Sequence, residues 1–114
     1  MGDKYYAFTA PIVPGQLGAW KNLVSELKGA KKKEYQAARK KMGVKHERVW
    51  LQHTPQGDFV VVSVEAKDAP SLFEKFANSK EPFDKWFAAQ ISEIHGIQLP
   101  GGAPPTNDLY LDIL

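Results

Sequence analysis

The alternation of hydrophobic and polar residues predicts four strands. An aromatic-rich run at 4–10 stops at Pro11, which is typical of a short strand. Two runs rich in β-forming residues, 46–53 and 59–65, flank a Thr-Pro-Gln-Gly-Asp link, and this arrangement predicts a hairpin. Residues 109–114 alternate in the same way, so we expect a fourth strand there.

Between these runs, apolar residues recur at three- and four-residue spacings, which predicts helices. The expected helices run from Pro14 to Gly29, over 30–42, just after Asp68, and from Glu81 to Gly96. The predicted order is a strand, a helical region, two strands, a second helical region and a last strand. This is the ferredoxin-like βαββαβ order. We therefore expect an α+β fold with a four-stranded antiparallel sheet and split helices on one face, in a single domain over 1–114.

Both faces of the predicted hairpin are largely apolar. We expect residues 54 and 58 to face each other, so that one face carries Arg48, Trp50, Gln52, Val60, Val62 and Val64. The other face, with Val49, Leu51, Phe59 and Val61, suits packing against the helices. Because an Arg and a Gln are costly to bury unpaired, we expect their face to lie away from the helices. Two such sheets packed face to face would bury it in a symmetric homodimer, with Arg48, Trp50 and Gln52 lining the barrel between subunits.

The element order and the segments EYQAARKKMGVKHERVWLQ, TPQGD and FDKWFAAQISEIHG resemble the dimeric α+β barrel superfamily. This superfamily holds the antibiotic-biosynthesis monooxygenases and their relatives, including small uncharacterised bacterial proteins. The resemblance implies the barrel fold and the homodimer. Its members include cofactor-free oxygenases, isomerases, haem-degrading enzymes and stress proteins, so it leaves the reaction open.

The haem-degrading branch of that superfamily uses an Asn on the first strand, a Trp in the second helical region and an iron-ligating His shortly after it. This chain has Trp86 and His95, but its first strand, KYYAFTA, contains no Asn. In a continuous helix, nine residues at about 100° each place Trp86 and His95 on opposite sides. We therefore predict no stoichiometric haem binding.

Composition narrows the class of protein further. The 114 residues include no cysteine, which excludes disulfides, zinc–thiolate and iron–sulfur sites and a cysteine nucleophile. The lack of cysteine suits a reducing compartment, and no signal peptide or membrane-length apolar run is recognisable, so we expect a cytoplasmic protein. Although the net charge is only +2, nine of the 15 basic residues fall within 28–48. This asymmetry could attract an anionic ligand, but without interleaved aromatics it favours a solvated helix face over nucleic-acid binding.

The candidate site residues come from the predicted barrel face and its surroundings. We expect the cavity to be lined by Arg48, Trp50, Gln52, Tyr110 and Trp86. His95 is the candidate for catalysis, against the alternative that its ring only interacts with carbonyls at a helix end. Glu47 and Glu65 are expected to be cross-strand neighbours at the sheet edge. His46 and His53 lie at opposite ends of one strand, so we expect no metal site, and no cofactor motif is present.

These features favour a small-molecule-binding barrel protein and leave open whether it is an enzyme. The alternatives are a cofactor-independent monooxygenase or isomerase, a haem-degrading monooxygenase, and a stress-type interaction protein whose barrel is only a core. Polar side chains converging in a sizeable cavity would favour a binding protein or an enzyme. A barrel filled with side chains would favour the stress-type interaction protein.

Overall fold

Seven regular elements follow one another in the order that the pattern predicts. The structure is a computed structural model that describes residues 5–68, 71–97 and 108–113. Its elements are β1 (Tyr5–Pro11), α1 (Leu17–Lys28), α2 (Lys32–Lys41), β2 (Val44–Thr54), β3 (Gly57–Ala66), α3 (Leu72–Ala77) and α4 (Pro82–His95).

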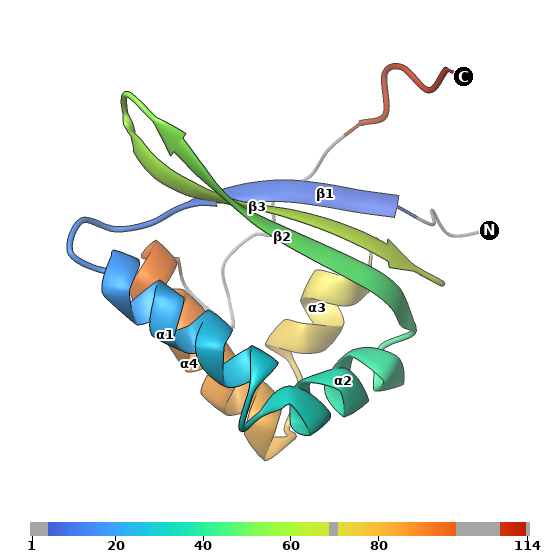
Figure 1. The fold of residues 1–114 in the computed structure, drawn as a ribbon. Helices are drawn as coiled ribbons and strands as arrows, with labels where there is room; N and C mark the ends of the chain where they lie inside the picture. Colours follow the sequence, from blue (N-terminus) through green and yellow to red (C-terminus); the bar gives the residue numbers. More distant parts are fainter. Residues whose placement is uncertain (1–4, 69–70, 98–107, 114) are drawn as a thin grey trace.

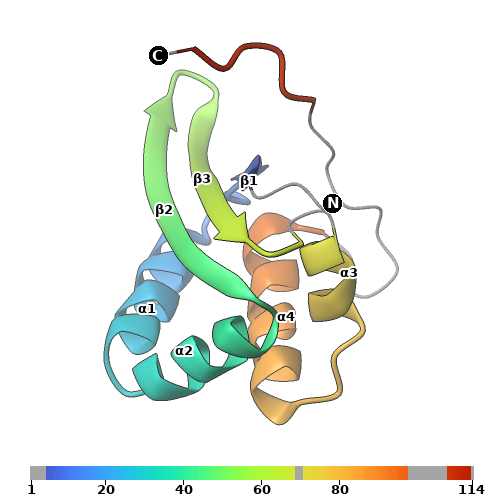
Figure 2. The same cartoon turned by 90° about the vertical axis from the view of Figure 1, so that its right-hand side faces the viewer.

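The elements form two layers, a sheet and a set of helices that covers one of its faces (Figure 1). The three strands are antiparallel in the order β1-β3-β2, with β3 in the centre. Helix α4 packs against the other three helices, and α2 also contacts β2. The turn of the β2–β3 hairpin extends beyond the helix layer (Figure 2). Within the described ranges, no helix combines the length and the apolar character needed to cross a membrane.

The predicted fourth strand is not found, so the expectation of a four-stranded ferredoxin-like sheet is wrong. Residues 108–113 have no regular secondary structure, and residue 114 lies outside the described residues. The chain is an α+β domain with a three-stranded antiparallel sheet and four helices. Alternation alone cannot make a strand, because a strand needs a neighbouring backbone that accepts its hydrogen bonds.

The hairpin register differs from the prediction by one residue. Thr54 pairs with Gly57, which leaves a two-residue turn of Pro55 and Gln56. Gly57 has a φ of +126°, a conformation that L side chains rarely adopt, and the Thr54 hydroxyl donates a hydrogen bond of 2.7 Å to its carbonyl. Because side chains alternate along a strand, this shift by one residue exchanges the face of every β3 residue relative to β2.

As a result, the two sheet faces are composed differently from the prediction. Val60, Val62 and Val64 are buried towards the helices, and their partners on β2 are Leu51, Val49 and Glu47. The opposite face, here called the outer face, carries Arg48, Trp50 and Gln52 paired with Ser63, Val61 and Phe59. The expectation that Trp50 points away from the helices is confirmed. The placement of Phe59 and Val61 against the helices is wrong.

The hydrophobic core is divided into two clusters. One lies on the sheet and is built around Val60, Val62 and Val64, and the other lies among the helices around Leu23 and Phe87. Ile12 and Trp20 pack against both clusters and connect them. The two layers are therefore joined at some points and held apart at others.

Candidate functional site

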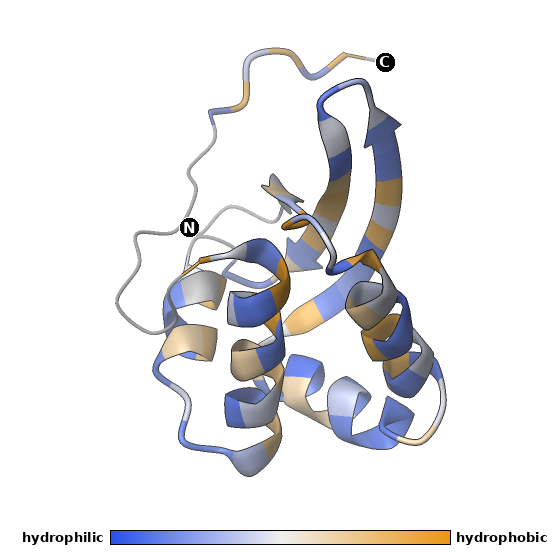
Figure 3. Ribbon diagram, turned by 90° about the vertical axis from the view of Figure 1, so that its left-hand side faces the viewer, coloured by the Kyte–Doolittle hydropathy of each residue, from blue (hydrophilic) through white to orange (hydrophobic). Residues whose placement is uncertain are grey.

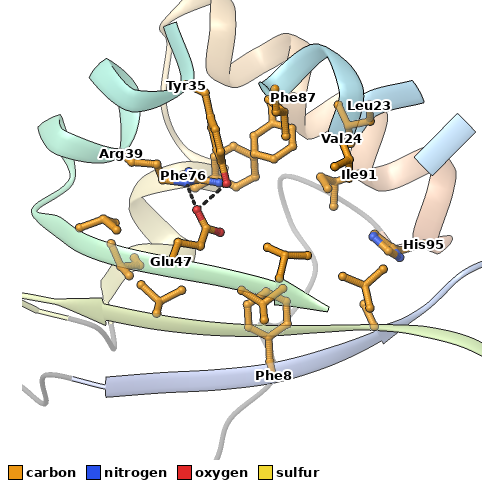
Figure 4. Close-up of a pocket in the computed structure, with 18 of the residues that line it drawn as sticks. Phe8, Leu23, Val24, Tyr35, Arg39, Glu47, Phe76, Phe87, Ile91 and His95 are labelled. Carbon is orange, nitrogen blue, oxygen red and sulfur yellow. Dashed lines mark hydrogen bonds and ion pairs between the residues drawn. The ribbon is translucent and has the colours of Figure 1, made fainter. Parts of the chain in front are cut away.

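A cavity of about 500 Å³ lies between the sheet and the helices (Figure 4). Its walls are mainly apolar and include Phe8, Val60 and Val62 from the sheet and Leu23, Val24 and Ile91 from the helices. Among its polar side chains are a Tyr–Arg–Glu cluster at one end and His95 at the other (Figure 4), and Tyr6 and Lys28 also line it. A cavity of this composition suits a small, mostly apolar molecule.

The polar cluster joins α2 to β2. Tyr35 and Arg39 are four residues apart, so both project from the same side of α2. The Tyr35 hydroxyl donates a hydrogen bond of 2.5 Å to Glu47 Oε1, and Arg39 Nε donates one of 3.0 Å to the same oxygen. The Arg39 and Glu47 side chains are only 18% and 15% exposed, so this ion pair is largely shielded from water.

An irregularity in β2 brings Val44 to the same face of the sheet as Glu47. Val44 pairs with Ala66 and His46 pairs with Glu65, so Lys45 is an extra residue in the strand. Without this bulge, Val44 and Glu47 would face opposite sides of the sheet, because they are three residues apart. With it, both side chains line the cavity.

The Arg39 guanidinium lies over aromatic rings as well as beside the carboxylate. Its centre is 4.9 Å from the ring of Tyr35, 5.1 Å from that of Phe87 and 5.5 Å from that of Phe76. Burial opposes the charged guanidinium, but its interactions with Glu47 and Tyr35 together outweigh burial and raise the pKa of Arg39. Burial, together with the Glu47 charge, raises the pKa of Tyr35 as well. At neutral pH the cluster is therefore a neutral phenol with a paired cation and anion.

The cluster still has polar atoms that can bind a ligand. Among the described residues, Glu47 Oε2 has no hydrogen-bond donor. Within the described residues, Arg39 Nη1 makes a weak contact of 3.9 Å with the sulfur of Met42. An acceptor and a donor thus stand side by side at this end of the cavity.

His95 is fixed at the end of α4, where the helix meets β1. Its Nδ1 lies 2.7 Å from the carbonyl oxygen of Pro11, and the Val13 amide donates a 2.9 Å hydrogen bond to the Ile94 carbonyl. Gly96 then ends the helix in the left-handed conformation, with a φ of +66°. The His95 ring is therefore held by a hydrogen bond to the Pro11 carbonyl of β1, and it lines the cavity.

The protonation state of His95 follows from these contacts. Burial lowers the pKa of its imidazole, and the bond to Pro11 only partly opposes this, so the ring is neutral at pH 7. A carbonyl oxygen can only accept a hydrogen bond, so Nδ1 must carry the ring proton. Nε2 is then an acceptor, and it has no partner among the described side chains.

Of the residues predicted to form the site, only His95 lines this cavity. Arg48, Trp50 and Gln52 lie on the outer face, and Tyr110 is 93% exposed. Trp86 is absent from the cavity wall because it lies between the helices, where Lys31 Nζ is 4.5 Å from its ring centre. Since α4 runs unbroken over Pro82–His95, Trp86 and His95 cannot both face one ligand.

Sequence reasoning missed the Tyr35–Arg39–Glu47 cluster. A signal was present, because Tyr35 and Arg39 stand one turn apart in a helix that was interpreted as a solvated basic face. The third member, Glu47, alternates with Val49 and Leu51 on the helix-facing side of β2, but the sequence does not show that it meets Tyr35 and Arg39. The expectation that Glu47 and Glu65 are cross-strand neighbours is also wrong. Glu47 pairs with Val64 on the helix-facing side of the sheet, whereas Glu65 pairs with His46 and lies on the outer face.

The described residues contain no group of three or more His, Cys, Asp or Glu side chains that could hold a metal ion. Comparison with known proteins gives no match to a family model, a curated protein or a solved structure. The function must therefore be argued from the chemistry of the cavity.

Proposed function

We propose that this protein binds a small, mostly apolar molecule in the cavity between its sheet and its helices. The volume of about 500 Å³ supports this, since it lies within the range of roughly 300–1,000 Å³ that is typical of ligand pockets. The mainly apolar walls, with a small number of polar side chains, also support it. Such walls contribute affinity by desolvation, and the few polar groups set the orientation of the ligand.

The Arg39–Glu47 pair supports a ligand with a neutral polar group. Because Glu47 already balances the charge of Arg39, an anionic group would gain little net attraction from this pair and would approach the second carboxylate oxygen, although Lys28 also lines the cavity. A hydroxyl group can donate to Glu47 Oε2 and accept from Arg39. The proposed ligand is therefore an apolar compound with a hydroxyl or similar group, in place of the anionic ligand expected from the charge distribution.

Three probes that share one ring system test this proposal. We expect 2-naphthol to bind about tenfold more tightly than naphthalene, since a hydrogen bond to a charged group is worth about 1.5–3 kcal/mol. The anion 2-naphthoate should bind more weakly than 2-naphthol. Dissociation constants from calorimetry or fluorescence titration would measure both differences. Equal affinity for all three probes would contradict the role of the polar cluster.

A pair of variants on α1 tests the location of the site. Val24→Trp places a large side chain in the cavity and should abolish binding of 2-naphthol, while Lys21→Trp adds the same side chain at an exposed position. Both variants should keep the far-ultraviolet circular dichroism of the parent chain. Unchanged binding in Val24→Trp would place the ligand elsewhere.

His95 favours a second candidate function, cofactor-independent proton transfer in an isomerase or a monooxygenase. A neutral imidazole with Nε2 free to accept a proton is a suitable general base. Nε2 would take a proton from a carbon next to a carbonyl, leaving an enolate, and would then return a proton to that carbon.

Exchange of deuterium into 2-tetralone, followed in heavy water, separates binding from proton transfer. If His95 acts as a base, the chain should accelerate the exchange over buffer, and His95→Gln should remove the acceleration while 2-naphthol still binds. Exchange at the buffer rate would leave a binding protein without this activity.

A further inference from the structure

Four of the five most exposed large apolar side chains of the described residues lie together at the C-terminal end, and the fifth is Tyr5. Leu109, Tyr110, Leu111 and Ile113 are 81%, 93%, 71% and 67% exposed. Single exposed apolar residues are ordinary, but four within five residues form a surface that water solvates poorly. In Figure 1 this segment lies on the side of the sheet away from the helices.

The segment has the side-chain pattern of a strand, although it is not part of one in this chain. Leu109, Leu111 and Ile113 alternate with Tyr110 and Asp112, as the colours in Figure 3 show. In an extended conformation, three aliphatic side chains would share one face and the two polar side chains the other. What it lacks is a neighbouring backbone to pair with.

Strand β1 offers such a backbone. It is an edge strand, with β3 as its one strand neighbour in the described part of the sheet. Edge strands usually carry charged residues that prevent pairing with other chains, but β1, with the sequence YYAFTAP, carries none. Its 7 residues are enough to pair with all six residues of the C-terminal segment 108–113.

We propose that the C-terminal segment 108–113 of one copy pairs with the edge strand β1 of a second copy. The donor segment and the acceptor edge belong to the same chain, so two copies can exchange segments reciprocally and form a closed twofold dimer. Pairing satisfies the backbone of the segment and places its three aliphatic side chains together on one face of the extended sheet. It also places the contact at a sheet edge, which differs from the face-to-face contact expected from the sequence.

Because the chain has no cysteine, a disulfide between introduced residues can test this pairing directly. We expect oxidation of a mixture of isotopically distinguished Leu111→Cys and Ala7→Cys chains to give a mixed disulfide of twice 12.7 kDa. As a matched control, Lys33→Cys, exposed on α2, replaces Ala7→Cys. A yield no higher than in this control would overturn the proposal. So would a double variant, Ala7→Cys with Leu111→Cys, that closes only within one chain.

Removal of the segment provides a second, independent test. Light scattering should give the full chain a mass twice that of one copy, and a chain ending at residue 107 the mass of one copy. Leu111→Asp should also shift the chain from dimer towards monomer, because it places a charge on the aliphatic face of the segment. A truncated chain that stays dimeric with native circular dichroism, or a full chain that is monomeric at high micromolar concentration, would show that the segment does not hold two copies together.

Discussion

Glu47 is the residue on which the polar cluster depends. It accepts hydrogen bonds from both Tyr35 and Arg39, and without its charge the guanidinium would be buried with no counter-ion. Breaking one side of a buried ion pair costs roughly 3–5 kcal/mol. We expect Glu47→Gln to lower the free energy of unfolding by about 3 kcal/mol, the lower end of that range, since the pair is not fully buried.

Urea denaturation of Glu47→Gln would measure this loss. The matched control is Glu81→Gln, which removes the carboxylate of the exposed pair with Lys41. Because exposed ion pairs contribute little, the control should leave the free energy of unfolding nearly unchanged. A loss in Glu47→Gln no larger than in the control would mean that Arg39 finds other partners.

His95 should make stability depend on pH. Burial holds the pKa of the folded imidazole below its value in the unfolded chain, about 6.5. Above that value the ring is neutral in both states. As the pH falls below it, the unfolded chain takes up a proton that the folded chain resists, so the free energy of unfolding decreases towards acid.

Unfolding measured between pH 7.5 and 5.5 would show this decrease. His95→Gln should reduce the dependence of the free energy of unfolding on pH, because glutamine does not titrate. Glutamine can still donate a hydrogen bond to the Pro11 carbonyl, so the contact between α4 and β1 is kept. If the free energy of unfolding changed equally with pH in the parent chain and in His95→Gln, His95 would not be the source of the pH dependence.

At the scale of elements, the end of α4 depends on Gly96. A side chain there would have to adopt a φ of +66°, and its Cβ would lie 3.0 Å from Val13 Cγ2. We expect Gly96→Ala to lower the free energy of unfolding by about 1–2 kcal/mol, the usual cost of this conformation for other residues.

Gly18 provides the opposite case for the same substitution. It lies within α1, and nothing stands within 4 Å of an added Cβ. Gly18→Ala should therefore raise the free energy of unfolding, by up to about 1 kcal/mol, because alanine favours the helix. Thermal denaturation of the two variants side by side would test whether the sign of the effect follows backbone conformation.

The positions of the helices and of the first three strands could be predicted from the sequence, because each has a clear periodicity and an end signal such as Gly43 or Gly96. The register of the hairpin could not. TPQGD contains a proline and a glycine, which indicate a turn but do not say whether two or three residues form it. That single choice decided whether Trp50 shares a face with Val61 or with Val62.

At the scale of the whole molecule, exchange of the C-terminal segment would couple folding to association. The melting temperature of the full chain should then rise with protein concentration, because association draws the equilibrium towards the folded state. A chain ending at residue 107 should melt at one temperature at all concentrations. Differential scanning calorimetry over a hundredfold range of concentration would separate the two behaviours.

The cavity is also a property of the whole molecule, and for this reason sequence reasoning placed it on the wrong face. The pattern identified apolar residues on α1 and α4 as core, and they are core. On β3 it placed Phe59 and Val61 against the helices, where the structure has Val60 and Val62. It could not show that the sheet and helix clusters stay apart over part of their area, which depends on how Ile12 and Trp20 bridge them.

The three tryptophans lie in three different surroundings. Trp20 lines the cavity, Trp50 is 49% exposed on the outer face, and Trp86 lies between helices beneath the ammonium group of Lys31. Indole emission shifts with the polarity around the ring, so each position has its own optical signal. With the other two tryptophans changed to phenylalanine, emission from Trp20 would follow occupation of the cavity, and emission from Trp50 would follow coverage of the sheet. The protein therefore contains separate fluorescent reporters for its interior and its surface.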